Sequence, residues 1–273
     1  MALDEALAIS VKDGFTPPAL RFYCWDRPSL SLGRFQKKEH FFRNKPGLDL
    51  EFIEQSGMPV VVRPTGGRAV LHGNELTYSL ASRYEGAFGG KDLYGCYAVI
   101  SSAIERALRR FGVPVEVKTG RDRIFHPGGT QRSSTGHDGK KDGPEREVKR
   151  PGRTSPCFAS VSYAEITANG RKIVGSAQRR WTGGFLQQGS IPFEIDWQLA
   201  KKVFGGFFSF DFAPSVMAGL ATLVPGASRE LFKRILAQEF EAVLGVPLVP
   251  SEPAPRELAL AQELLPVYES ACF

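Results

Sequence analysis

The spacing of apolar residues predicts that the chain opens with a helix and continues as strands. Leu3, Leu7 and Val11 recur at a helical period, which indicates an amphipathic helix. In residues 19 to 25, "ALRFYCW", inward and outward side chains alternate as in a half-buried strand, and Cys24 falls on the inward face. The segments "SLSLG" and "PVVVRP" predict two more strands, the second of them buried.

A longer helix is predicted in residues 91 to 113, "KDLYGCYAVISSAIERALRRFGV". Its apolar residues recur every three or four positions and form one stripe, so the helix is expected to pack against a core. Cys96 belongs to this stripe and should be buried. The residues of the stripe are Leu93, Cys96, Ile100, Ile104, Leu108 and Phe111.

The second half of the chain begins with a hairpin signal and ends in helices. Asn169 and Gly170 supply the two positive-φ residues of a type I′ turn between strands at 163–168 and 172–177. Another strand is expected in "FLQQGSIPFEI", followed by helices in "DWQLAKKVF", "ASRELFKRILAQEFEAVLG" and "PRELALAQELL". Because strands come first and helices gather late, the pattern favours an α+β fold.

Charge is concentrated in one segment of this chain of 273 residues, which carries a formal net charge of +6. Residues 121 to 153 contain nine Lys or Arg and five Asp or Glu, a balance of +4, and almost no apolar residues. Such a segment cannot repay the entropy of ordering, so we expect a flexible insertion in a catalytic unit of residues 1–250, followed by a helical tail at 251–273. A basic tract could bind RNA or an acidic partner, but a solvated loop is favoured and no nucleic-acid partner is expected.

Several classes of protein are excluded by pattern. No apolar run approaches the roughly 18 residues of a membrane span, and the N-terminus lacks the basic start and cleavage site of a signal peptide, so a cytoplasmic protein without a membrane partner is expected. The cysteines at 24, 96, 157 and 272 share no paired spacing, so no metal site is predicted. Phosphate-loop, dinucleotide-binding and nucleophile-elbow motifs are lacking.

A glycine pair flanked by polar residues interrupts the strands at "VVRPTGGRAVLHGNELTYSL", residues 61 to 80. Gly66 and Gly67 would let the backbone approach a ligand and aim N–H groups at a carbonyl that becomes an oxyanion. Arg63, Arg68 and His72 would frame that pocket. A tight turn between two strands explains the glycines equally well from the residues alone.

Four blocks of sequence resemble one family. "MALDEAL", "LRFYCWDRPSLSLGRFQ", "RPTGGRAVLHGNELTYSL" and "GRKIVGSAQRRWTGGFLQQGSI" together resemble the biotin/lipoate protein ligase superfamily, and most closely its cysteine-dependent octanoyltransferases. The resemblance covers most of residues 1 to 200. It implies a class II synthetase-like catalytic fold with a mixed sheet flanked by helices and a smaller second sheet. It also implies roughly one further strand before Met1, and a shorter segment before Cys157 than this chain has.

The implied reaction moves an octanoyl group from acyl carrier protein to a lysine of a lipoyl domain, such as glycine cleavage H protein, without a cofactor. Cys157, in "SPCFASVSYAEI", matches the cysteine that carries the acyl group, and Lys172 matches a lysine that lowers the pKa of the thiol and orients the carbonyl. The other cysteines are weaker candidates, two on predicted core faces and one beside the C-terminus. The substrate-binding residues implied by the match are Arg63, Thr65, Gly66, Gly67, Arg68, Ala69, His72, Gly175, Ser176, Ala177 and Gln178.

Three alternatives stay open at this point. An ATP-dependent lipoate ligase on the same fold would use Lys172 to contact an acyl-adenylate, and an amidotransferase would take octanoyl or lipoyl from another lipoyl-bearing protein. A non-enzymatic acyl-chain carrier is the third. A monomer is expected, and basic residues are candidates for docking the acidic carrier protein. These candidates are Lys37, Lys38, Arg179 and Arg180.

Overall fold

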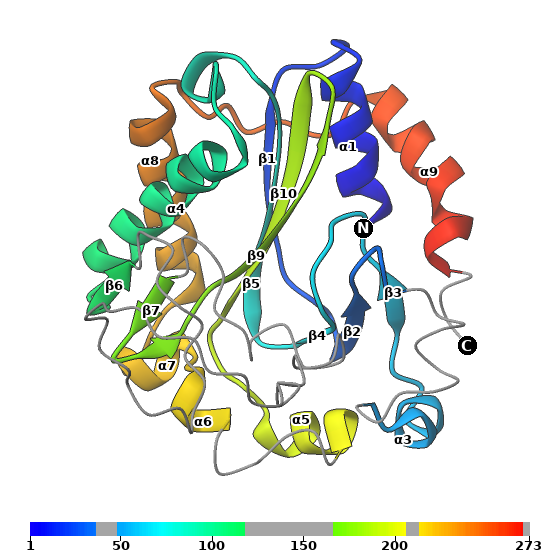
Figure 1. Ribbon diagram of the computed structural model, residues 1–273, viewed down its shortest axis with the longest axis vertical. Helices are drawn as coiled ribbons and strands as arrows, with labels where there is room; N and C mark the ends of the chain where they lie inside the picture. The colour runs from blue at the N-terminus through cyan, green and yellow to red at the C-terminus, as the bar shows by residue number, and fades with distance from the viewer. Residues whose placement is uncertain (37–47, 118–165, 206–212, 270–273) are drawn as a thin grey trace, which may run out of the picture.

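An antiparallel sheet runs through the centre of the molecule, and helices cover both of its faces (Figure 1). The computed structural model describes residues 1–36, 48–117, 166–205 and 213–269. Within these ranges the sheet has the spatial order β1-β5-β10-β9, and every neighbouring pair is antiparallel. Its strands are β1 (Ala19–Tyr23), β5 (Glu75–Arg83), β9 (Gly175–Trp181) and β10 (Gly184–Pro192).

Two smaller sheets flank the main one. In the first, with order β3-β2-β4, β2 is parallel to β3 and antiparallel to β4. The second has the order β6-β7-β8 and is antiparallel. The mixed pairing that the resemblance implied is therefore found in a smaller sheet and not in the main one. The strands are β2 (Ser29–Leu32), β3 (Val60–Val62), β4 (Val70–His72), β6 (Val115–Val117), β7 (Ile166–Ala168) and β8 (Arg171–Lys172).

Two pairs of long helices enclose the main sheet. Helices α4 (Leu93–Arg110) and α8 (Arg229–Leu244) lie on one side, and α1 (Ala2–Lys12) and α9 (Pro255–Glu269) lie on the other (Figure 1). Local signals explain where α4 and α8 start, because Asp92 and Ser228 accept hydrogen bonds from backbone N–H groups three residues on. Helix α8 ends at Gly245, whose φ of +68° is the left-handed conformation of a helix cap.

Five shorter helical elements complete the described ranges, and they contact different parts of the fold. Helix α5 begins at Asp196, whose side chain accepts from the N–H of Leu199 at 2.8 Å. None of the helices in the described ranges combines the length and hydropathy needed to cross a bilayer. The short elements are α3 (Leu50–Gln55), η1 (Gly86–Phe88), α5 (Trp197–Phe204), α6 (Ala213–Val216) and α7 (Leu220–Leu223). Of these, η1 contacts α4 and α8, α3 contacts α5, and α6 contacts β8.

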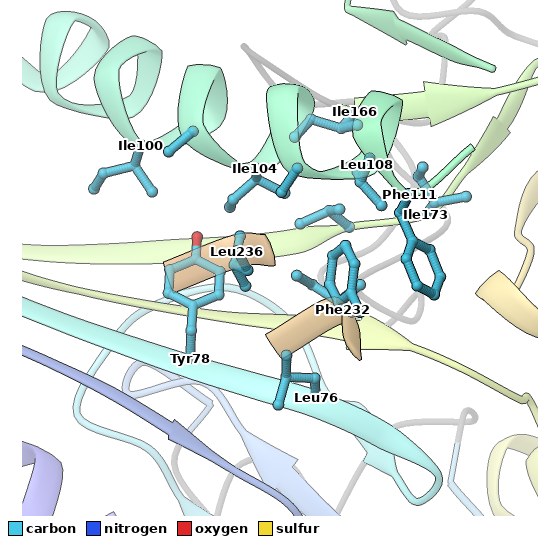
Figure 2. Close-up of a cluster of buried hydrophobic side chains, with 14 of the residues drawn as sticks. Leu76, Tyr78, Ile100, Ile104, Leu108, Phe111, Ile166, Ile173, Phe232 and Leu236 are labelled. Atoms are coloured by element: carbon cyan, nitrogen blue, oxygen red, sulfur yellow. The ribbon is translucent and has the colours of Figure 1, made fainter. Parts of the chain in front are cut away.

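The main apolar core lies between the sheet and the α4–α8 pair (Figure 2). Leu76 and Tyr78 point into it from β5, and Phe232 and Leu236 reach it from α8. The predicted stripe of α4 faces the same core, with Cys96 fully buried. The stripe prediction is thus confirmed, although Leu93 at the start of the helix is only half-buried.

The predicted hairpin is present but short. Asn169 and Gly170 have φ values of 50° and 70°, as a type I′ turn requires. The strand expected from 172 to 177 is divided, because β8 ends at Lys172 and β9 begins at Gly175 as part of the main sheet. Residues 163–165 of the other predicted strand lie outside the described residues.

The prediction for Cys24 is wrong. Strand β1 ends at Tyr23, and Cys24 is exposed, with its Sγ accepting a hydrogen bond from Arg229 Nη1 at 3.4 Å. The alternating pattern continues to residue 25, but the pairing with β5 stops at Tyr23 opposite Thr77. The charged insertion at 121–153, Cys157 and Cys272 lie outside the described residues.

Candidate active site

One arginine holds the glycine loop between β3 and β4. The guanidinium of Arg63 is buried and donates to the carbonyl of Gly66 from Nε at 3.1 Å and from Nη2 at 2.8 Å. Nη2 also donates to the carbonyl of Arg68 at 2.7 Å. Nη1 donates to the carbonyl and the Oγ of Ser31, at 3.1 and 3.0 Å. The side chain of Arg63 therefore binds the loop's own backbone and fixes its shape.

The glycines of this loop serve different purposes. Gly67 has a φ of +94°, a conformation that other residues rarely adopt. A Cβ on Gly33, at the end of β2, would overlap the carbonyl oxygen of Gly67, so two backbones touch here. Gly66 has no such constraint, because a Cβ there would meet only the ring of Phe35 at 3.8 Å. The loop therefore needs glycine at 67, whereas Gly66 leaves its backbone open to a neighbouring group.

The residues that follow the loop form one wall of a cavity of about 500 Å³. Ala69 and His72 lie on this wall, and α5, the end of β10 and Met217 supply the others. Apolar side chains dominate the lining, with a few polar groups among them, as in typical small-molecule sites. The lining residues are Pro28, Ala69, Leu71, His72, Gly73, Asn74, Glu75, Ser190, Pro192, Glu194, Ile195, Asp196, Trp197, Leu199, Ala200, Phe204 and Met217.

His72 is held at one face of its ring and at both nitrogens. The ring is buried and stacks on Trp25, with the ring centres 4.1 Å apart. Nδ1 lies 2.9 Å from Glu75 Oε1, and Nε2 lies 2.7 Å from Ser31 Oγ. Burial by itself would raise the pKa of Glu75, but the electrostatic interaction with His72 and hydrogen bonds from His72 and Thr77 outweigh it and lower that pKa below its usual value.

Four predicted substrate-binding residues of β9 are divided between the two faces of the main sheet by strand alternation: Gly175, Ser176, Ala177 and Gln178. Ala177 pairs with Gln188, whose Oε1 accepts from Thr65 Oγ1 at 2.8 Å, so this position shares a face with the glycine loop. Gly175 pairs with Ser190 of the cavity wall and lies on the same face.

Ser176 and Gln178 lie on the opposite face. The hydroxyl of Ser176 is 2.8 Å from the hydroxyl of Tyr78, and Gln178 Nε2 donates to Gln187 Oε1 at 3.0 Å. Burial raises the pKa of Tyr78 to about 12 despite these polar neighbours, so its hydroxyl keeps its proton. The structure therefore brings Gly175 and Ala177 toward the loop and takes Ser176 and Gln178 away from it.

Lys172 lies behind the cavity wall. It is buried at the end of β8, its carbonyl accepts from the N–H of Ala218 at 3.1 Å, and its backbone pairs with that of Met217, which lines the cavity. Arg68 is half-buried at the end of the loop. The predicted nucleophile, Cys157, lies outside the described residues.

The candidate docking residues that the structure describes contact this chain itself. Arg179 Nη1 donates to Glu5 Oε1 at 2.5 Å, and Arg180 Nε donates to the hydroxyl of Tyr84 at 2.6 Å. Lys37 and Lys38 lie outside the described residues. Docking of a carrier protein by these residues therefore stays a prediction.

A buried carboxylate connects helix α1 with the loop. Asp4 Oδ1 accepts from Arg21 at 2.7 Å and from Ser79 at 2.8 Å, and Oδ2 accepts from Tyr23 at 2.9 Å and from Gln188 at 2.7 Å. Burial opposes the charge of Asp4, but the attraction of Arg21 and the hydrogen bonds from Ser79 and Arg21 contribute to lowering its pKa below the usual value. Because Gln188 also contacts Thr65, α1 and the glycine loop share one polar network.

Sequence reasoning missed Ser31, Glu75, Gln188 and Asp4. One signal was available: Asp4 falls at helical spacing from Leu7 and Val11, and an acid on the buried face of a helix needs partners. Glu75 follows His72 by three residues, a spacing that allows a contact at a strand end, but nothing in "SLSLG" distinguishes Ser31 from any other strand residue.

Comparison with solved structures defines the class of fold. The chain superposes on "lipoate-protein ligase A bound with ATP" with a TM-score of 0.69 and 21% identity, over 97% of this chain and 87% of that one. A putative lipoate protein ligase from T. acidophilum with bound lipoic acid gives a TM-score of 0.68 at 21% identity, over 97% of this chain and 87% of that one. The predicted α+β catalytic fold is therefore confirmed.

Sequence comparison defines the family. The chain belongs to the family described as "Lipoyl protein ligase A/B catalytic domain", which matches residues 1–241. It is 39% identical over 196 residues to "Octanoyltransferase LipM" of Moorella thermoacetica, an alignment that covers 72% of this chain and 61% of that protein. The protein of the same name from Kyrpidia tusciae is 33% identical over 279 residues, which cover 98% of this chain and 90% of that protein. The matched part thus spans less than two thirds of the Moorella protein's length.

Proposed function

We propose that this chain is an octanoyltransferase of lipoate biosynthesis, which moves an octanoyl group from acyl carrier protein to a lysine of a lipoyl domain such as glycine cleavage H protein. The apolar cavity next to the glycine loop is the observation that carries the proposal. The relatives named octanoyltransferase, one of which aligns with 98% of this chain, support the same reaction. The proposal includes the cytoplasmic location expected from the sequence.

The cavity suits the tail of the substrate. Each buried CH₂ group contributes about 0.8 kcal/mol, so an octanoyl chain among Leu71, Leu199 and Phe204 gains several kcal/mol of binding energy. Ala69 connects this wall to the glycine loop, so the carbonyl end of the chain would lie beside the loop. Backbone N–H groups of the loop would then stabilise the oxyanion of the tetrahedral intermediate.

The chemistry that we propose needs a thiolate and no nucleotide. The Sγ of Cys157 attacks the thioester carbonyl, a new C–S bond forms as the C–S bond to phosphopantetheine breaks, and the departing thiolate takes up the proton that the Cys157 thiol lost. The acceptor lysine then attacks the acyl-enzyme as a neutral amine, the amide bond forms as the C–S bond to Cys157 breaks, and the departing Cys157 thiolate takes up the proton that the amine loses. Since the donor is already activated, ATP is not required.

Lys172 has two roles in this scheme. The ammonium of this buried residue would stand beside Cys157, lower the pKa of the thiol and orient the carbonyl. The catalytic unit would comprise residues 1–250 with the charged insertion before Cys157, and residues 251–273 would form its helical tail.

Intact mass after incubation with octanoyl carrier protein tests the proposal. The wild type should gain one octanoyl group without ATP, Cys157→Ala should gain none, and Cys24→Ala, which removes an exposed thiol, should behave as the wild type. Addition of a lipoyl domain should discharge the adduct. ATP-dependent attachment of free lipoate that persists in Cys157→Ala would overturn the proposal in favour of a ligase, and no adduct in the wild type would overturn it as well.

The role of Lys172 is tested separately. In Lys172→Ala the midpoint of iodoacetamide alkylation of Cys157 should move to higher pH, because the thiolate loses a neighbouring cation, and acylation should slow. Arg171→Ala, next to it on β8, is the matched control. An unchanged midpoint would remove Lys172 from the mechanism and leave the rest of the proposal in place.

A further inference from the structure

A continuous chain of hydrogen bonds joins the cavity wall to the glycine loop. It runs from Glu75 to His72 at 2.9 Å, from His72 to Ser31 at 2.7 Å, and from Ser31 to Arg63 at 3.0 Å. Arg63 then binds the carbonyls of Gly66 and Arg68. Glu75 and His72 line the cavity, whereas Ser31 is fully buried and is not among the described lining residues.

The direction of each bond follows from the groups that can donate. A guanidinium has only donors, so Ser31 Oγ accepts from Arg63. The carboxylate of Glu75 accepts, so Nδ1 of His72 carries a proton, and Oε1 of Glu75 also receives the hydroxyl of Thr77 at 2.5 Å. The hydroxyl proton of Ser31 is then available to Nε2 of His72. Ser31 thus donates to the histidine and accepts from the arginine at the same time.

Arg63 sets the direction of the loop's N–H groups. Across a planar trans peptide the C=O and the following N–H point in opposite directions. Because the carbonyl of Gly66 points to the guanidinium, the N–H of Gly67 points away from it, and the same holds for the N–H that follows the carbonyl of Arg68. A shift of the guanidinium would therefore turn the groups that are available to an oxyanion.

We propose that Ser31 is a positioning residue for acyl transfer. It holds the side chains of Arg63 and His72 in fixed positions relative to each other, so that the N–H groups of the glycine loop and the cavity wall are both correctly placed around the substrate carbonyl. The proposal rests on the octanoyl transfer proposed above. Without the hydroxyl, Nη1 of Arg63 loses one of its acceptors, and Nε2 of His72 loses its donor. Ser31 touches no cavity space, so its effect must pass through these two neighbours.

Ser31→Ala and Ser29→Ala form a matched pair. Both serines are buried on β2, but the hydroxyl of Ser29 donates to the carbonyl of Arg27 at 3.0 Å and takes no part in the chain. In Ser31→Ala the rate of Cys157 acylation at saturating donor should fall about tenfold to a hundredfold, less than the loss of a whole oxyanion donor, while KM changes little. Ser29→Ala should stay within about twofold of the wild type.

Two further measurements separate positioning from general damage. Ser31→Thr keeps the hydroxyl and adds volume, so it should retain more of the acylation rate than Ser31→Ala does. Imidazole ¹⁵N spectra should show the proton of His72 on Nδ1 in the wild type, with an Nε2 resonance that moves in Ser31→Ala and stays in Ser29→Ala; its assignment comes from its loss in His72→Gln.

The results that would overturn the positioning role of Ser31 differ from those that would overturn octanoyl transfer. A wild type that acylates normally, together with equal acylation rates in Ser31→Ala and Ser29→Ala, would overturn the positioning role alone. A wild type that forms no acyl adduct would overturn the octanoyl transfer and the positioning role with it. If Ser31→Ala does not fold, Ser31→Thr decides through the spectra: a proton on Nε2 of His72 in the wild type or in Ser31→Thr would overturn the proposed direction of the hydrogen bonds.

Discussion

Both faces of the main sheet are buried, but along β5 one face buries apolar and aromatic side chains and the other buries small polar side chains. Along β5, Leu76 and Tyr78 face the α4–α8 side, while Thr77 and Ser79 face the α1 side. Apolar burial on the first side contributes stability in proportion to area. Polar burial on the second side contributes little net stability but requires that every group finds its partner, and so it fixes geometry. The glycine loop lies on the second side.

The largest effect is expected on the apolar side. Phe232 is fully buried and packs edge-on against Phe111 and Phe193, with ring centres 5.1 and 6.0 Å apart. Phe232→Ala should destabilise the protein by about 3 to 5 kcal/mol, measured by denaturant unfolding. The exposed neighbour Leu231 provides the control, since Leu231→Ala should cost less than about 1 kcal/mol. Similar losses in both variants would contradict the division between the faces.

A smaller effect that depends on pH is expected on the polar side. Asp4→Asn removes a buried charge that accepts four hydrogen bonds and should cost about 1 to 3 kcal/mol at neutral pH. Because the folded-state pKa of Asp4 is lowered, its contribution is present above the usual carboxyl value of about 4 and is lost as the pH falls through the folded-state value.

Unfolding curves measured from neutral to acid pH check this dependence. The stabilities of the wild type and Asp4→Asn should converge on acidification. Asp13→Asn, which changes an exposed acid at the end of the same helix, should remain parallel to the wild type. A constant gap between the wild type and Asp4→Asn at all pH values would show that charge is not what Asp4 contributes.

The smallest changes in stability are expected when two cysteines, one buried and one exposed, are each replaced by serine. Cys96→Ser puts a hydroxyl into the apolar core and should cost about 1 to 3 kcal/mol of stability. Cys24 is exposed directly after the end of β1, so Cys24→Ser should change stability by less than about 0.5 kcal/mol. Thermal melting of the two variants measures the difference. A loss in Cys24→Ser as large as that in Cys96→Ser would mean that its contact with Arg229 matters to the fold.

Local patterns predicted local structure well. The stripe of α4, the cap at Gly245 and the turn at Asn169 and Gly170 were all readable, because each depends on neighbours within a few residues. The division of the strand after Lys172 was not, since it depends on which sheet accepts the next residues. For the same reason Cys24 was misplaced: β1 ends where its partner strand stops pairing, and no pattern in its own sequence marks that point.

The candidate site was predictable in part. The residues indicated a special role for the glycine pair and singled out Arg63 and His72, but they did not show that only Gly67 has a positive φ or what Arg63 and His72 bind. Ser31 has the sequence context of an ordinary strand residue, and only tertiary structure gives it two charged or polar neighbours. Lys172 and Cys157 were found by resemblance alone, because a hairpin lysine and a lone cysteine carry no chemical signature by themselves.

The contact of Asp4 with Gln188 also constrains how the protein is made. The two residues are 184 positions apart, and Tyr268 of α9 donates to Glu5 of α1 at 2.6 Å across a still longer span. During synthesis α1 therefore leaves the ribosome long before Gln188 and α9 exist, and until then a buried Asp4 would lack part of its set of hydrogen-bond donors. The apolar half between α4 and the early strands can begin to collapse first, while the half that contains the glycine loop is assembled late, after β10 has been made. A ribosome that stalls before Gln188 would release a chain whose first helix can meet β1 and β5 but lacks the contacts to β10 and α9.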